Sequence, residues 1–203
     1  RSTDFILGRT IGSHGLGIYN AAVELANLPS TELIAPVNRA VFPAYARLAA
    51  TRDQLWERFL GVYGLICWVA FPVAFALVLL SGPVVEVLLG PQWGESVPVL
   101  RIFAVCGLVG ALQSNLYVAI VAIGQPKANT YLSAAILFVS LPCVVLASLR
   151  WGVLGAAVAH GIVALLALAG ILGVFRRVTG VRLRLLGARM GRPVANALVM
   201  VLA

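Results

Sequence analysis

Long apolar runs without a charged residue constrain the fold of this chain more than any other feature. Four are present, at Phe59–Leu80, Ile102–Ile123, Thr130–Leu149 and Gly152–Phe175. Each has about the 20 residues that an α-helix needs to cross the bilayer's hydrocarbon core of about 30 Å. Strands of a membrane barrel would be shorter and would alternate apolar with polar residues. The runs therefore predict transmembrane helices.

The composition supports this interpretation. Of the 203 residues, 61% are hydrophobic and 11% are charged, whereas soluble domains are about 45–50% apolar and about 25% charged. A soluble globular domain, a disordered chain and a coiled coil are therefore excluded. Three cysteines are too few for a disulfide scaffold. The remaining class is all-α, a polytopic transmembrane helix bundle.

A fifth, weaker span is predicted at Gly15–Val37, where Glu24 and Glu32 interrupt the apolar pattern. Partial spans at residues 1–8 and 194–203 flank the complete ones. We therefore expect about five complete spans plus two partial ones. Residues 1–193 would form the bundle, and residues 194–203 would begin a further helix. Because the chain opens on Arg1 and ends inside an apolar run, we expect a fragment of a longer protein.

The placement of basic residues predicts an orientation. The chain has 15 basic and 7 acidic residues, a net charge of +8. Grouped by alternate connections, 11 basic residues fall on one side of the predicted bundle and 2 on the other. The more basic side of a membrane protein faces the cytoplasm, so the connections at residues 38–58, 124–129 and 176–193 should be cytoplasmic. No basic stripe interleaved with aromatic residues indicates nucleic acid as a partner.

Polar residues share one face of the weak fifth span. At about 100° per residue, a stripe about 60° wide contains Asn20, Glu24, Asn27, Thr31 and Asn38. A polar or charged side chain facing lipid costs several kcal/mol, so the stripe should face protein or water. It predicts either the wall of a cavity for a hydrophilic substrate or a seam of hydrogen bonds between helices.

Other polar residues near or within the spans leave similar alternatives. Gln113 and Tyr117 lie four apart on one face, which favours either a cavity wall or helix packing. Arg39 lies near the cytoplasmic boundary, where it would meet a lipid phosphate or anchor the span. His160 is the one histidine within a span; it would couple protons or hydrogen-bond a backbone carbonyl.

Small residues four apart predict close helix contacts at two places. Gly107 with Ala111, and Ala157 with Gly161, have the spacing that lets helix backbones approach each other in lipid. No pattern predicts an enzyme, a metal or a cofactor. Cys67, Cys106 and Cys143 have no CxxC spacing, and nucleotide-binding, GxSxG and HExxH motifs are missing from the sequence.

An ordered set of short motifs points to a family. In chain order they read DFILGR at 4–9, ANLP at 26–29, RAVFPA at 39–44, GPVV at 82–85, LLGPQW at 88–93 and GQP at 124–126. This set resembles the polysaccharide transporter (Wzx-like) branch of the multidrug, oligosaccharidyl-lipid and polysaccharide exporter superfamily. Oligosaccharide flippases belong to this branch. Within the motifs we single out Asp4, Arg9 and Pro43.

The resemblance implies two helix bundles around a central cavity, and this chain would be most of the second bundle. Alternating access would turn a lipid-linked oligosaccharide across the bacterial cytoplasmic membrane, with polysaccharide-assembly proteins as possible partners. Arginines would hold the pyrophosphate, and here Arg9 and Arg39 lie near candidate positions. The alternatives are another exporter of the superfamily, for a drug or a teichoic-acid unit, a membrane-embedded glycosyltransferase or polymerase, and a non-transporting scaffold.

Overall fold

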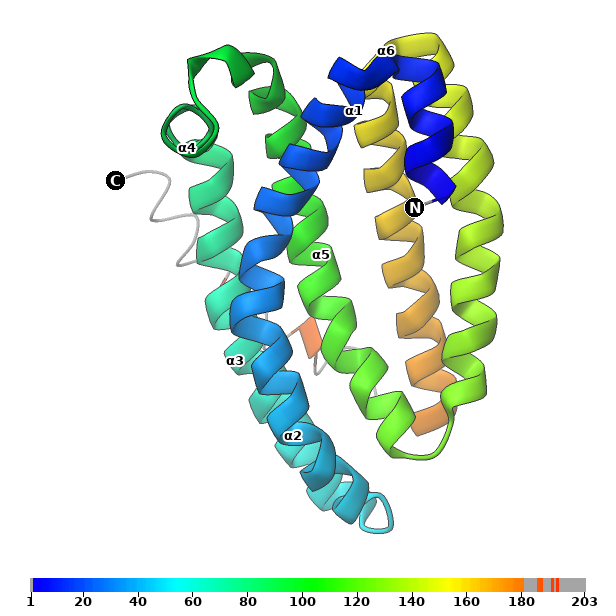
Figure 1. The fold of residues 1–203 in the computed structure, drawn as a ribbon. Helices are drawn as coiled ribbons and strands as arrows, with labels where there is room; N and C mark the ends of the chain where they lie inside the picture. The colour runs from blue at the N-terminus through cyan, green and yellow to red at the C-terminus, as the bar shows by residue number, and fades with distance from the viewer. Residues whose placement is uncertain (1, 181–185, 188–190, 192, 194–203) are drawn as a thin grey trace.

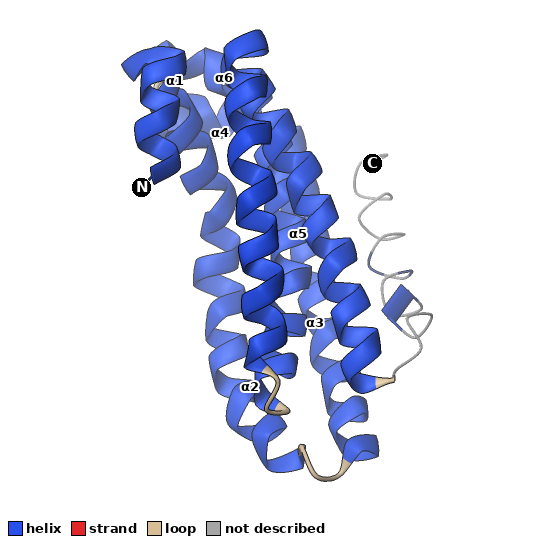
Figure 2. Cartoon of the chain, turned by 90° about the vertical axis from the view of Figure 1, so that its right-hand side faces the viewer, coloured by secondary structure: helices blue, strands red, loops and turns tan. Residues whose placement is uncertain are grey.

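In a computed structural model the chain forms a bundle of long helices (Figure 1). The structure describes residues 2–180, 186, 187, 191 and 193. The elements within these ranges, in order, are α1 (Ser2–Pro29), the π-helix η1 (Ser30–Ile34), α2 (Ala35–Leu48), α3 (Arg52–Leu79), α4 (Ser81–Leu88), the 3₁₀-helix η2 (Pro91–Ser96), α5 (Val97–Ala122) and α6 (Pro126–Thr179). Figure 2 shows no strand in this part of the chain. The predicted all-α class is confirmed.

Two of these elements are each broken by a glycine. In α1, Gly12 has φ +74°, and the ten residues before it fold back beside the rest of the bundle (Figure 1). In α6, Trp151 leaves helical geometry and Gly152 has φ +60°, a conformation that side chains with a Cβ seldom adopt. The chain reverses there. We name residues 126–150 the first arm of α6 and residues 153–179 its second arm.

Helices α1 and α2 form one continuous rod through η1. The π-helix begins directly after Pro29, and Pro36 follows it. Each proline removes a backbone donor and crowds the preceding turn, so a wider turn with i→i+5 hydrogen bonds accommodates both rings. A π turn adds about one residue to the helical repeat, which rotates everything beyond it by about 100° relative to an unbroken α-helix.

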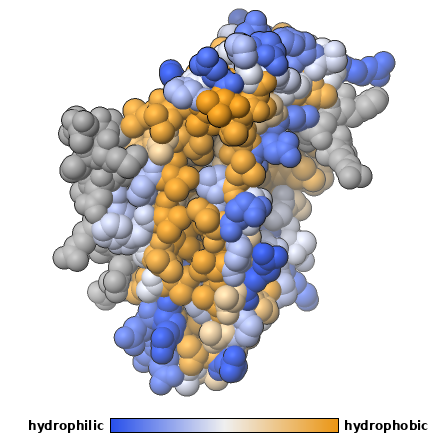
Figure 3. Space-filling model, turned by 60° about the vertical axis from the view of Figure 1, so that its left-hand side comes forward, coloured by the Kyte–Doolittle hydropathy of each residue, from blue (hydrophilic) through white to orange (hydrophobic). Residues whose placement is uncertain are grey.

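The long helices have the character of membrane spans. Residues 53–79, 91–122 and 126–179 are long and apolar enough to cross a bilayer, and the last range contains both arms of α6. They include the predicted uncharged runs at residues 130–149 and 152–175 and all but the last residue of those at 59–80 and 102–123. Figure 3 shows a broad hydrophobic band between hydrophilic ends. The protein is therefore a multi-pass membrane protein. The count of five spans stays a prediction. The further helix predicted to begin at residues 194–203 lies outside the described part of the chain.

Connections gather at the two ends of the bundle as the alternation of spans requires. The break at Gly12, the α4–η2 segment and the turn of α6 lie at one end, while the α2–α3 and α5–α6 turns lie at the other (Figure 1). At the first end, His14 Nε2 and Glu95 Oε2 lie 3.4 Å apart and link α1 to η2. Which end is cytoplasmic remains the prediction made from the arginines.

The core is held by aromatic rings and by close backbone contacts. Between α3 and the second arm of α6, the rings of Phe59 and Phe175 pack at an interplanar angle of 32° with centroids 5.0 Å apart. Tyr19 meets Phe103 edge-on at 5.0 Å. A Cβ at Gly107 would lie 2.7 Å from the carbonyl oxygen of Ala26. The close helix approach predicted at Gly107 is confirmed, and its partner is α1.

Candidate functional site: two adjoining cavities between α1, α5 and α6

The first cavity lies where α1 and α5 meet both arms of α6. It has a volume of about 500 Å³. Its polar lining comes from three helices: Asn20 and Asn27 of α1, Gln113 of α5, and Ser140 and His160 of α6. Cavities of this size suit small-molecule or sugar-sized ligands.

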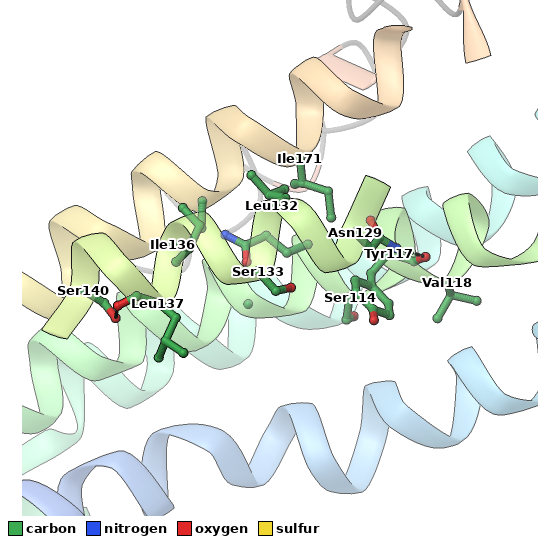
Figure 4. Close-up of a pocket in the computed structure, with 13 residues that line it drawn as sticks. Ser114, Tyr117, Val118, Asn129, Leu132, Ser133, Ile136, Leu137, Ser140 and Ile171 are labelled. Atoms are coloured by element: carbon green, nitrogen blue, oxygen red, sulfur yellow. Dashed lines mark hydrogen bonds between the residues drawn. The ribbon is translucent and has the colours of Figure 1, made fainter. Parts of the chain in front are cut away.

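The second cavity adjoins the first along the groove between α5 and α6. It has a volume of about 600 Å³. Figure 4 shows its residues on facing helices, with Tyr117 and Asn129 close together at one end and Ser140 at the other. The two cavities share Gly110, Gln113, Ile136, Ser140 and Ala167. They therefore form one track along the bundle, with Gln113 at its middle.

The predicted stripe of α1 divides between the first cavity and the open face of the helix. Asn20 and Asn27 line the first cavity. Glu24 is exposed on the same helix but is not among the cavity's lining residues. Thr31 is exposed, and its hydroxyl donates to its own helix, at the carbonyls of Asn27 (3.3 Å) and Leu28 (3.1 Å).

Asn38, the last member of the stripe, lies between helices. Its Nδ2 donates to Ser114 Oγ at 2.8 Å, and Asn115 Nδ2 donates to Asn38 Oδ1 at 2.9 Å. Asn115 Nδ2 also approaches the Tyr45 hydroxyl at 3.5 Å. The π turn between Thr31 and Asn38 accounts for this placement, because it rotates α2 so that Asn38 faces α5.

The two α5 candidates both line the track. Gln113 lines both cavities and Tyr117 lines the second. Gln113 Nε2 donates to the carbonyl of Ala164 at 2.8 Å, so this residue also ties α5 to the second arm of α6. Tyr117 is 45% exposed, and its backbone carbonyl accepts from Asn129 Nδ2 at 3.1 Å.

His160 belongs to an aromatic cluster at the far end of the first cavity. Its Nδ1 lies 3.3 Å from the Tyr19 hydroxyl, and its ring meets Phe103 edge-on at 5.3 Å. The partner shown for the imidazole is thus a side-chain hydroxyl of α1, where the sequence suggested a backbone carbonyl. Tyr19 and His160 come from helices far apart in the chain, which is why the sequence did not pair them.

The remaining candidates lie away from the track. Arg39 and Pro43 are exposed on α2, and Arg9 is exposed on α1 before the break at Gly12. Asp4 lies in the same first segment of α1, and its side chain is outside the described part. Arg9, Arg39 and Pro43 are not among the described residues that line the cavities.

Three cavity residues were missed in the sequence, although they carry a signal. Asn129, Ser133 and Ser140 lie on the first arm of α6 and line the second cavity. Their spacings of four and seven residues place them on one helical face. Within an apolar run they form a second polar stripe, which faces the α5 side of the track.

The chemistry of the track is polar and nearly uncharged. No Asp, Glu, Lys or Arg is among the described residues that line either cavity. The lining offers amides, hydroxyls and aromatic faces beside aliphatic carbon. Such a surface can hydrogen-bond a neutral hydroxylated molecule and contact its apolar faces, but it provides no countercharge for a phosphate. Among the described residues, no three His, Cys, Asp or Glu side chains gather as metal ligands.

Comparison with known families points to polysaccharide assembly. Residues 1–98 match a family model described as polysaccharide biosynthesis protein. The match covers α1 through η2 and includes Asn20 and Asn27 of the first cavity. No solved structure matches this chain significantly.

Curated relatives agree with that match. The teichuronic acid biosynthesis protein TuaB of Bacillus subtilis is 28% identical over 132 residues, which are 65% of this chain and 27% of TuaB. The lipopolysaccharide biosynthesis protein WzxC of Escherichia coli is 24% identical over 150 residues, 74% of this chain and 30% of WzxC. The succinoglycan biosynthesis transport protein ExoT of Rhizobium meliloti is 26% identical over 99 residues, 49% and 20% of the two chains. The chain thus matches less than a third of each relative's length. These matches confirm the resemblance carried by the motifs: over part of its length the chain is similar to bacterial polysaccharide biosynthesis and transport proteins.

Proposed function

We propose that this chain forms one bundle of a transporter that moves a lipid-linked oligosaccharide across the bacterial cytoplasmic membrane by alternating access. The observation that carries the proposal is the uncharged polar track between α1, α5 and α6. A saccharide presents hydroxyl donors and acceptors at its edges and C–H surfaces on its faces. The amides of Asn20, Asn27 and Gln113 beside the Tyr19 and Phe103 rings match both features.

The uncharged lining of the track suits the sugars of the cargo, whereas its phosphates need a different site. The track provides contacts for the neutral sugars, whereas the pyrophosphate of a lipid-linked unit requires cations. The arginines of α1 and α2 nearest the bundle, Arg9 and Arg39, are exposed rather than in the track. In this proposal the phosphate binds at the membrane boundary or at parts of the protein beyond this chain, and the track carries the glycan. The reaction is transport, with no covalent step.

The experiment is an export assay in the full-length protein. Asn27→Ala removes an amide from the first cavity without touching the core contacts of α1, since Asn27 is exposed on that face. Losing one hydrogen bond to the cargo should lower export about 2- to 10-fold. The measurement is surface polysaccharide per unit of membrane-inserted protein, together with the lipid-linked unit that accumulates inside. Gln54→Ala, an exposed polar residue of α3 outside both cavities, is the control.

Two results would contradict the proposal in different ways. Unchanged export by both Asn27→Ala and Asn20→Ala would remove the first cavity from the transport path. A change in glycan length with no change in the leaflet that holds the lipid-linked unit would instead indicate a polymerase or glycosyltransferase.

A further inference from the structure

A buried amide whose oxygen has no hydrogen-bond partner among the described residues lines the second cavity. Asn129, in the first turn of α6, is 1% exposed. Its Nδ2 donates to the carbonyl of Tyr117, but its Oδ1 has no hydrogen-bond partner among the described residues. A buried acceptor left unpaired destabilises the folded state, because it has given up its hydrogen bonds to water. Such an atom inside a cavity is a site at which a ligand's donor relieves that cost.

The surroundings of Asn129 select the chemistry of that donor. The lining residues include the exposed Tyr117 ring, the Ser133 hydroxyl one turn along α6, and the apolar side chains of Leu132 and Val118 (Figure 4). No charged side chain is among the described residues that line the cavity, so an ionic ligand group would be desolvated without compensation. A neutral hydroxyl beside an apolar ring face satisfies every part of this lining.

We propose that Asn129, Tyr117 and Ser133 form a second sugar subsite, in which Asn129 Oδ1 accepts a hydrogen bond from a hydroxyl of the glycan. This inference rests on the proposed transport function and adds a position on the path, because the second cavity joins the first through Gln113. Asn129 Oδ1 is covered in the present conformation. The exposed side chains that line the cavity, Tyr117 and Ser133 among them, change rotamer within nanoseconds, and we expect such a change to open this atom to the glycan.

Comparison of export with melting temperature separates the acceptor from the tie that Asn129 also makes to Tyr117. In the full-length protein, Asn129→Leu removes both the acceptor and the donor at similar volume. Asn129→Asp keeps both at nearly the same volume: burial favours the neutral form of a carboxyl, and that form donates its O–H to the Tyr117 carbonyl and retains a carbonyl oxygen. Thr130→Ala is the matched control, since Thr130 is the next residue, is exposed and bonds its own helix at the Pro126 carbonyl.

The readouts are surface polysaccharide per inserted protein and the melting temperature of the purified protein. We expect Asn129→Leu to lower export about 2- to 10-fold, the loss for one unmet hydrogen bond. Its melting temperature should be unchanged, because removal of the buried unpaired oxygen offsets loss of the bond to Tyr117. Asn129→Asp should export within about twofold of the parent protein, since its hydrogen bonds are kept, and Thr130→Ala should match the parent.

Wild-type export by Asn129→Leu would overturn the subsite. So would a loss of export by Asn129→Leu that is matched by a loss of melting temperature and restored together with it in Asn129→Asp, because that pattern belongs to a purely structural tie. Neither result changes the expectation for Asn27→Ala, so failure of this subsite is distinguishable from failure of the transport function.

Discussion

Replacing Gly107 with alanine tests the contact on which the relative position of α1 and α5 depends. The new Cβ would lie 2.7 Å from the carbonyl oxygen of Ala26 and 3.6 Å from its carbonyl carbon. The carbonyl of Ala26 belongs to the backbone and cannot move aside by a rotamer change, so one helix must shift by several tenths of an ångström. Overpacking of this kind costs about 1–3 kcal/mol.

The intrinsic gain of alanine over glycine within a helix, about 0.8–1.0 kcal/mol, opposes that cost. Gly61→Ala isolates the gain, because Gly61 lies in α3 and a Cβ there would meet nothing within 4 Å. The difference between the two variants therefore measures the helix contact itself, which we expect to be about 1–3 kcal/mol.

The assay is thermal unfolding of the purified full-length protein in detergent, followed by tryptophan fluorescence. Gly107→Ala should unfold at a lower temperature than Gly61→Ala, and Gly61→Ala at or slightly above the parent. If Gly107→Ala unfolded at or above the temperature of Gly61→Ala, the close approach of α1 to α5 would not exist in solution. The first cavity, which these two helices line, would then have a different shape.

Two further measurements test the packing and the topology. Asn38→Ala and Asn115→Ala should be coupled in a double-mutant cycle by about 0.6 kcal/mol, the average for hydrogen bonds between membrane helices, because each residue loses its partner in the other's absence; additive effects on unfolding would argue against the pair. A cysteine at Thr51, in a protein whose exposed Cys143 has been replaced by serine, should resist an impermeant thiol reagent outside intact cells, whereas one at Gly94 should react; labelling at Thr51 would reverse the orientation assigned from the arginines.

The helices themselves were predictable because their cause is local. An uncharged apolar run of span length has one stable form in lipid, and the runs at residues 59–80 and 102–123 lie almost entirely within α3 and α5. Their starts were less predictable. Helix α3 begins at Arg52, seven residues before the apolar run, since charged residues continue a helix beyond the hydrocarbon without any hydropathy signal.

The site was predictable only in part, because its geometry is not local. An α-helical wheel placed Asn20 and Asn27 on one face, and both line the first cavity. The same wheel placed Asn38 with them, but the π turn at Ser30–Ile34 rotates α2 away. No propensity marks where a helix widens by one residue. The pairs His160 with Tyr19 and Asn115 with Asn38 depend on which helices are neighbours, and a single sequence does not specify this.

The break in α6 has a consequence for the synthesis of the protein. Two residues reach at most about 7 Å. The linker of Trp151 and Gly152 is therefore too short to let one arm of α6 lie far from the other. We therefore expect the two arms to enter the bilayer as a pair, and a side chain with a Cβ at position 152, which disfavours a positive φ, to hinder that step. The second arm then returns to the end of the bundle that holds the α5–α6 turn (Figure 1), so a residue that binds nothing is expected to help determine on which side of the membrane Arg176 and Arg177 lie.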